Sequence, residues 1–84
     1  MSELIDDIAG LVDVVVRPLV DVEEDLSIES YEEDDGTICI EIRVNEEDAG
    51  KVIGRQGRVI KAIRTLARAA ASREGSHVEV ELID

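Results

Sequence analysis

The sequence predicts an α+β fold in which three helices cover one face of a three-stranded mixed sheet. Three segments repeat apolar residues at helical spacing, and three shorter segments alternate apolar with polar residues, as half-buried strands do. Their order is helix, strand, strand, helix, helix, strand. The first two strands are joined by a short turn and should pair antiparallel. The third follows a two-helix crossover and should lie parallel to the second.

The length of 84 residues suits one small domain, predicted over residues 1–84. Residues 1–24 form its N-terminal helix and connector, and residues 26–83 its strands and helix pair. No apolar run approaches the roughly 20 residues that span a bilayer. The acidic first residues lack the basic-then-apolar pattern of a secretory signal. We therefore expect a cytoplasmic protein without a membrane segment.

The first helix is predicted from residue 3 onward, because apolar residues keep the i, i+3, i+4 spacing as far as Leu19. Pro18 lies inside this pattern and must either kink the helix or end it close to Arg17. We expect a kink or a loosened last turn. An acidic connector over residues 22–25 follows.

A strand is predicted over residues 26–31 and a second over residues 37–44. The turn between them ends in Asp-Gly, a pair that accepts the positive φ of a hairpin. In the second strand Ile38, Ile40, Ile42 and Val44 point one way, and Cys39, Glu41 and Arg43 point the other. The last strand, residues 77–83, alternates in the same way and presents Glu79 and Glu81 on the polar side.

Cys39 is the only cysteine and His77 the only histidine. An intramolecular disulfide is therefore impossible, and we expect neither a metal site nor a cofactor. No catalytic base is evident for the thiol, so Cys39 is predicted to be an inert side chain on the polar face or beside a neighbouring strand. His77 is predicted to be an exposed residue at a strand end.

The helix pair begins at Asn45, a favourable N-cap before three acidic residues. Its first helix is short and ends at Gly54, and an exposed turn through Arg55 and Gln56 leads to a second helix that starts near Gly57. The apolar side of the first helix comprises Ala49, Val52 and Ile53. The second helix carries an apolar stripe of Val59, Ile60, Ile63, Leu66, Ala67 and Ala70.

Positive charge is concentrated around this turn. The chain has a net charge of −12, yet residues 49–73 hold seven basic residues and no acidic one. Unpaired amides at the start of the second helix, at the positive end of its dipole, favour a phosphate there, and Arg55 and Arg58 add full charges. The alternative is a basic helix that only pairs with acidic neighbours. Elsewhere the acidic chain should repel nucleic acid, and its polar sheet face lacks the aromatics of a base-stacking platform.

The segment V-I-G-R-Q-G-R-V-I-K-A-I, residues 52–63, resembles the V-I-G-x-x-G-x-x-I core of KH domains, whose GXXG loop clamps nucleotide backbone. The helix and strand that precede the βααβ core resemble the type II arrangement. The whole chain, including residues 17–21 and 78–84, is similar to the KhpA family of small bacterial RNA-binding proteins. The strong acidity and the longer start, residues 1–10, depart from that family.

The resemblance implies a non-catalytic protein that clamps short single-stranded RNA, acting as an RNA chaperone or post-transcriptional regulator that affects cell elongation and division. It also implies a homodimer, or a heterodimer with a KhpB-like protein. The RNA-binding residues that it implies are Lys51, Gly54, Arg55, Gln56, Gly57, Arg58 and Lys61. Val52, Ile53 and Ile60 are candidates for a base groove, with a plain core role as the alternative.

A second hypothesis is a protein-interaction adaptor that works mainly through a KH-containing partner, with weak RNA contact of its own. The intact glycines and basic residues of the turn favour RNA binding. An enzyme is disfavoured because the turn offers no Ser/His or Cys/His pair and no pocket of paired carboxylates. A nucleotide-phosphate loop is disfavoured because the G-x-x-x-x-G-K-[ST] spacing is missing.

Overall fold

The computed structural model describes residues 2–83, with the helices and strands in the predicted order. The helices are α1 (Ser2–Val16), α2 (Glu46–Ile53) and α3 (Arg58–Ser72). The strands are β1 (Ser27–Glu32), β2 (Ile38–Arg43) and β3 (Val78–Ile83). Short 3₁₀ turns occupy Arg17–Leu19, Glu23–Asp25 and Arg55–Gly57.

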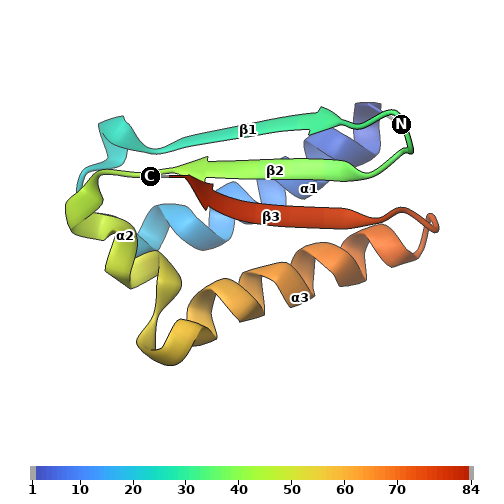
Figure 1. Ribbon diagram of the computed structural model, residues 1–84. Coiled ribbons are helices and arrows are strands. Elements are labelled where there is room, and N and C mark those ends of the chain that lie inside the picture. The colour runs from blue at the N-terminus through green and yellow to red at the C-terminus, as the bar shows by residue number, and fades with distance from the viewer. Residues whose placement is uncertain (1, 84) are drawn as a thin grey trace.

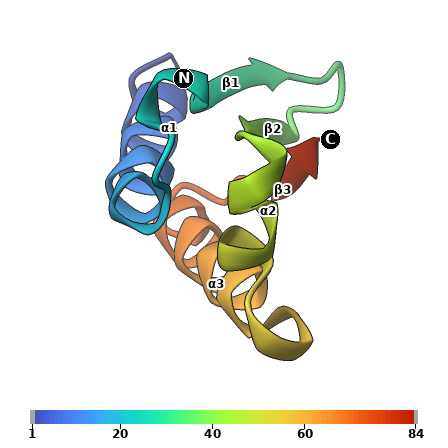
Figure 2. The same cartoon turned by 90° about the vertical axis from the view of Figure 1, so that its left-hand side faces the viewer.

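The central strand is β2, which pairs antiparallel with β1 and parallel with β3. This mixed topology confirms the predicted fold class. The helices lie on one side of the sheet, and its other face is free of helices (Figures 1 and 2). The turn between α2 and α3 lies at one end of the molecule, far from the hairpin that joins β1 to β2 (Figure 1).

A hydrophobic core fills the space between the helices and the sheet. Burying each isoleucine or valine side chain stabilises the fold by about 1.5–3 kcal/mol. Within residues 2–83 the buried cluster comprises Ile8, Val12, Val16, Val20, Ile38, Ile40, Ile42, Val52, Ile60, Ile63, Ala67, Ala71, Val78 and Val80.

Pro18 ends the first helix near Arg17, which was the alternative to the expected kink or loosened last turn. The α-helix stops at Val16, and the chain continues as the 3₁₀ turn Arg17–Leu19. Proline has no N–H to donate, and its ring crowds the preceding turn, so the α-helical pattern cannot continue through it. The last turn is therefore tightened rather than loosened, because a 3₁₀ turn has fewer residues per turn than an α-helix.

One apolar residue of α3 does not join the core as predicted. Leu66 is 47% exposed, whereas the buried row of this helix is Ile60, Ile63, Ala67 and Ala71. At 3.6 residues per turn, Leu66 lies about a quarter turn away from the middle of that row. The sheet is narrow, and it covers only the row that faces it directly.

Candidate nucleic-acid interface

Three of the four residues of the turn between α2 and α3, residues 54–57, have positive φ. Gly54 has φ 78° and ψ 172°, Gln56 has φ 59° and ψ 24°, and Gly57 has φ 76° and ψ 16°. The N–H of Gly54 closes α2 by donating to the carbonyl of Gly50 at 2.9 Å. Positive φ is uncommon for glutamine, so the surrounding structure must hold Gln56 in this conformation.

The amides of this turn are used differently from the prediction. The N–H of Gly57 donates to the Gly54 carbonyl at 3.1 Å, and that of Arg58 donates to the Arg55 carbonyl. These two amides at the start of α3 are therefore occupied by the 3₁₀ turn. Among the backbone hydrogen bonds of residues 2–83, none is donated by the first amides of that turn, those of Arg55 and Gln56. They are the donors that the turn can offer to an anion.

Gly54 is required by close packing as well as by its backbone angles. A Cβ built at this position would lie 2.8 Å from the backbone nitrogen of Val59, and it would also overlap the Val59 side chain. At Gly57 a Cβ would meet only Lys61 Cε at 3.9 Å, an ordinary contact. The two glycines therefore have different roles. Gly54 lets α3 approach the end of α2, and Gly57 supplies a left-handed residue.

Three basic side chains surround the turn. Arg55, Arg58 and Lys61 are all exposed. The Arg58 Nη2 donates to Gln56 Oε1 at 3.2 Å, and Lys61 Cε would lie 3.9 Å from a Cβ built at Gly57, so the Lys61 stem passes beside the turn. Within residues 2–83 no carboxylate lies within 4.0 Å of these three cations. The alternative of internal pairing with acidic neighbours is therefore not seen at the turn itself.

Lys51, by contrast, is already paired. Its Nζ contacts the Asp21 carboxylate and lies 3.1 Å from Asp48 Oδ1, and these contacts raise its pKa. The side chain of Asp48 is 1% exposed, and its oxygens accept from the backbone N–H groups of Asp21 and Val22 at 3.0–3.1 Å. Those N–H groups, and then Lys51, hold the pKa of Asp48 below its usual value despite burial. This cluster fixes α2 to the connector, and Lys51, which was predicted to extend the positive strip, is engaged in it.

Arg64 is also engaged within the fold. Its Nε donates to the carbonyl of Val80 in β3 at 3.1 Å, and the side chain is only partly exposed. The basic residues of α3 therefore have different environments after its first turn. Lys61 lies at the GXXG turn, and Arg64 covers the edge of the sheet.

The candidate base-groove residues separate into two environments. Val52 is fully buried and Ile60 is 7% exposed, so both contribute to the hydrophobic core. Ile53 is 41% exposed at the end of α2, immediately before Gly54. Of the three, it is the apolar side chain that a nucleotide base could reach. The sequence pattern placed Val52 and Ile53 on the same apolar side of a short helix and did not show that only Val52 is buried.

The helix-free face of the sheet carries mainly acidic side chains. Glu41 is partly exposed there, and Glu79 and Glu81 are exposed. Cys39 was predicted to be an inert side chain on this face, and the structure places its Sγ near the carboxylates of Glu33 and Glu79. The sequence alone did not predict this group, because its three residues come from different segments of the chain. Among the described helices, none has the length and apolar character of a membrane span.

Comparisons with known proteins agree on one family. Residues 9–82 match the family model described as KhpA/KhpB, KH domain. The RNA-binding protein KhpA of Clostridium perfringens is 45% identical over 73 residues, covering 87% of this chain and 96% of that protein. The protein of the same name from Borreliella burgdorferi is 40% identical over 74 residues, covering 88% and 89%. That of Listeria monocytogenes serovar 1/2a is 44% identical over 70 residues, covering 83% and 91%. The family match begins at residue 9, in keeping with the longer start.

Proposed function

The chain belongs to the KhpA/KhpB KH-domain family, and on that premise we propose that it binds short single-stranded RNA at residues 54–57 without catalysing a reaction. The observation that carries this proposal is the turn itself. It combines two unpaired amides with three exposed cations, Arg55, Arg58 and Lys61, in a chain with a net charge of −12. Relatives named RNA-binding proteins support the nature of the ligand.

The geometry suggests how the RNA backbone would lie. The absence of side chains at Gly54 and Gly57 lets a sugar-phosphate strand approach the turn closely. Phosphates would accept from the amides of Arg55 and Gln56, with Arg58 and Lys61 on either side. A GXXG loop of this kind holds about four nucleotides, and Ile53 would contact a base.

The affinity should be modest and sensitive to salt. Three cations that neutralise phosphates of a single strand give a slope of about −2 in log K against log salt, a loss of about 20-fold between 50 and 200 mM. The acidic surface elsewhere repels RNA, so the dissociation constant should be on the order of micromolar. This repulsion also confines RNA to the turn.

The test is fluorescence anisotropy with a labelled single-stranded RNA pool and the variant Arg55→Asp/Gln56→Asp. Aspartate tolerates positive φ better than glutamine, so the backbone at position 56 is not penalised. The matched control is Arg73→Asp/His77→Asp, which changes the net charge by the same three units at the other end of α3. That helix has 15 residues and is therefore about 22 Å long, well beyond the screening length of about 8 Å at physiological salt.

We expect the turn variant to lose more than about tenfold in affinity at an unchanged unfolding midpoint, and the control to lose little. Equal losses in both variants would assign binding to net charge rather than to the turn. No binding by the wild-type protein would favour the adaptor hypothesis, in which a KH-containing partner supplies the RNA contact.

The family also supports a proposed setting for this activity. We propose a cytoplasmic RNA chaperone or post-transcriptional regulator, affecting cell elongation and division, that works as a homodimer or with a KhpB-like partner. Leu66, which α3 leaves 47% exposed, is an apolar side chain available for such a protein contact.

A further inference from the structure

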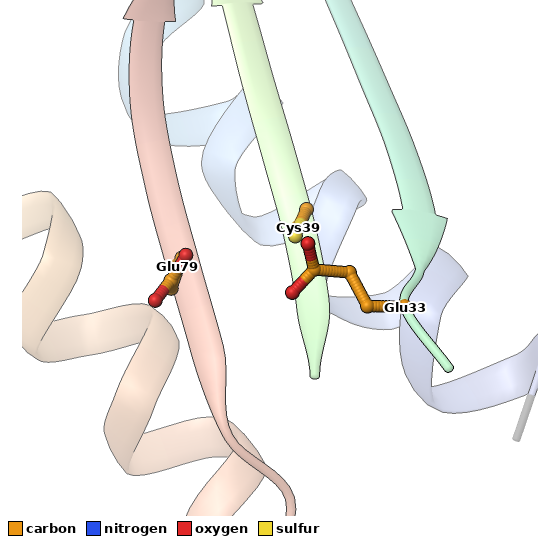
Figure 3. A group of neighbouring side chains, drawn as sticks. All are labelled: Glu33, Cys39 and Glu79. Atoms are coloured by element: carbon orange, nitrogen blue, oxygen red, sulfur yellow. The ribbon is translucent and has the colours of Figure 1, made fainter. Parts of the chain in front are cut away.

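A group of metal-ligand side chains lies on the helix-free face, away from the turn (Figure 3). Glu33 follows β1, Cys39 lies in β2 and Glu79 in β3, and Figure 3 shows the Glu33 carboxylate over Cys39, with Glu79 on the neighbouring strand. The two carboxylate oxygens and the Sγ all lie within 4.8 Å of one another. The ladder places Cys39 directly between Tyr31 of β1 and Glu79 of β3.

The burial of Cys39 distinguishes this group from an ordinary acidic surface. Its side chain is only 7% exposed, although it belongs to the polar face, and it lines a hollow of about 180 Å³. The rest of that hollow is formed by Tyr31, Glu33, Ile40, Glu41, Glu79 and Glu81. Burial raises the pKa of the Cys39 thiol above its ordinary value; interaction with the Tyr31 hydroxyl opposes this shift, and the carboxylates of Glu33 and Glu79 add to it. The thiol, a soft donor, is therefore surrounded by carboxylate oxygens, which are hard donors.

Two of the carboxylates that line the hollow, those of Glu33 and Glu79, have no matching cation within residues 2–83. Within residues 2–83 no basic side chain lies within 4.0 Å of the Glu33 or Glu79 carboxylates. The nearby Arg43 is paired with Glu29 and with Glu41, the latter at 3.4 Å. Carboxylates held beside one another without a counter-charge repel, so an added cation would relieve the repulsion.

We propose that Glu33, Cys39 and Glu79 form a binding site for one thiophilic divalent cation, of which Zn²⁺ fits best. Zn²⁺ accepts a thiolate at about 2.3 Å and carboxylate oxygens at about 2.0–2.2 Å, and a site with three protein ligands keeps a fourth position for water. In a tetrahedral arrangement those ligand atoms lie about 3.5 Å apart. Because both glutamates are exposed, rotation of their side chains can close the remaining gap of about 1 Å.

Such an ion would join the end of β1 to β2 and β3 at the hairpin end of the sheet. Binding would stabilise the folded protein, since the three ligands come together only when the sheet forms. The site is independent of RNA binding at the opposite end of the molecule, so the failure of either proposal leaves the other intact.

The experiment is a titration of the full chain, in excess phosphine reductant, with Zn²⁺ by calorimetry and with Co²⁺ by absorption spectroscopy. Cys39→Ser and Glu79→Gln remove one ligand each. Glu24→Gln is the matched control, because it removes the same charge from an exposed position outside the hollow. The Zn²⁺ stoichiometry, the thiolate-to-cobalt charge-transfer band and the unfolding midpoint with and without Zn²⁺ are measured for each protein.

We expect one Zn²⁺ per chain, a charge-transfer band with Co²⁺ and a rise of several degrees in the midpoint. Cys39→Ser should abolish the band, and both ligand variants should bind Zn²⁺ more than tenfold more weakly, because even outer-shell losses cost about 10–100-fold. Glu24→Gln should behave as wild type. If Zn²⁺ does not bind, if Co²⁺ binds without the band, or if Glu24→Gln weakens binding as much as Glu79→Gln, the proposal is wrong. Glu79→Gln, at an exposed position, keeps the test valid even if Cys39→Ser folds poorly.

Discussion

Replacing Gly54 with alanine should destabilise the domain far more than the same change at Gly57. At Gly54 the backbone has φ 78° and ψ 172°, a region essentially restricted to glycine that costs other residues about 1–3 kcal/mol. The new Cβ would also lie 2.8 Å from the Val59 nitrogen, and overpacking of this kind costs about 1–3 kcal/mol. The two contributions together reach about 2–6 kcal/mol.

At Gly57 only the backbone is affected. Its angles, φ 76° and ψ 16°, lie in the left-handed helical region, which costs an L-residue about 1–2 kcal/mol. The Cβ would find Lys61 Cε at 3.9 Å and displace nothing. In both variants alanine also lowers the conformational entropy of the unfolded chain, which offsets the loss of stability by about 0.4–1 kcal/mol. Gly57→Ala should therefore cost about 0–1.6 kcal/mol.

Thermal unfolding followed by circular dichroism measures this difference. A change of 1 kcal/mol shifts the midpoint by about 4–8 °C in a domain of this size, so Gly57→Ala should lower it by roughly 5 °C and Gly54→Ala by more than about 10 °C. A domain of 84 residues has about 4–12 kcal/mol of stability to lose. Equal midpoints for the two variants would refute the close approach of α3 to α2 at Gly54.

Three further predictions concern other parts of the fold. Asp48→Asn should lower the unfolding midpoint by several degrees at pH 7. Because the folded-state pKa of Asp48 is depressed, its contribution is present above the unfolded value of about 4 and is lost as the pH falls, so the variant and wild type should converge in acid melts. Lys51→Gln should lower the unfolding midpoint and leave the salt dependence of RNA binding unchanged. Arg58→Gln should leave the midpoint unchanged and reduce the slope of log K against log salt by about 0.7. If anisotropy shows the smaller slope for Lys51→Gln instead of Arg58→Gln, the roles given to these two residues are wrong. Leu66→Ser should change the free energy of unfolding by less than about 0.5 kcal/mol, because the side chain is exposed. A larger loss in denaturant unfolding would show that Leu66 is part of the core.

Local signals predicted much of the fold. The side chain of Asn45 accepts from the Glu47 N–H at 2.9 Å, which confirms the predicted N-cap, and Gly54 ends α2 as expected. Gly36 adopts φ 90° in the predicted hairpin turn. These features depend on a few neighbouring residues, and one residue type strongly favours each backbone conformation.

Long-range contacts were not predictable in the same way. Asp48 appeared to be one more acidic residue in the first turn of a helix, yet it is buried against backbone amides 26 and 27 positions earlier in the chain. Its negative charge then determines the position of Lys51. Nothing in the local sequence distinguishes a solvated carboxylate from one that accepts three hydrogen bonds across the fold.

The candidate site shows the same division. The positive φ and the charge of the turn follow from its own residues, but the exposure of Ile53 beside the buried Val52 depends on where the sheet ends. The approach of Glu33 and Glu79 to Cys39 required the register of three strands. A pairing offset of one residue would have turned those side chains to the other face.

The most direct measurement of the central claim is an NMR titration of the ¹⁵N-labelled protein with a short single-stranded RNA. The account predicts that the shifted amides lie in residues 53–61, with those of Arg55 and Gln56 among the largest changes, and that the shifts weaken as salt is raised. Shifts centred on the helix-free face of the sheet, or on the 3₁₀ turn Glu23–Asp25, would contradict it.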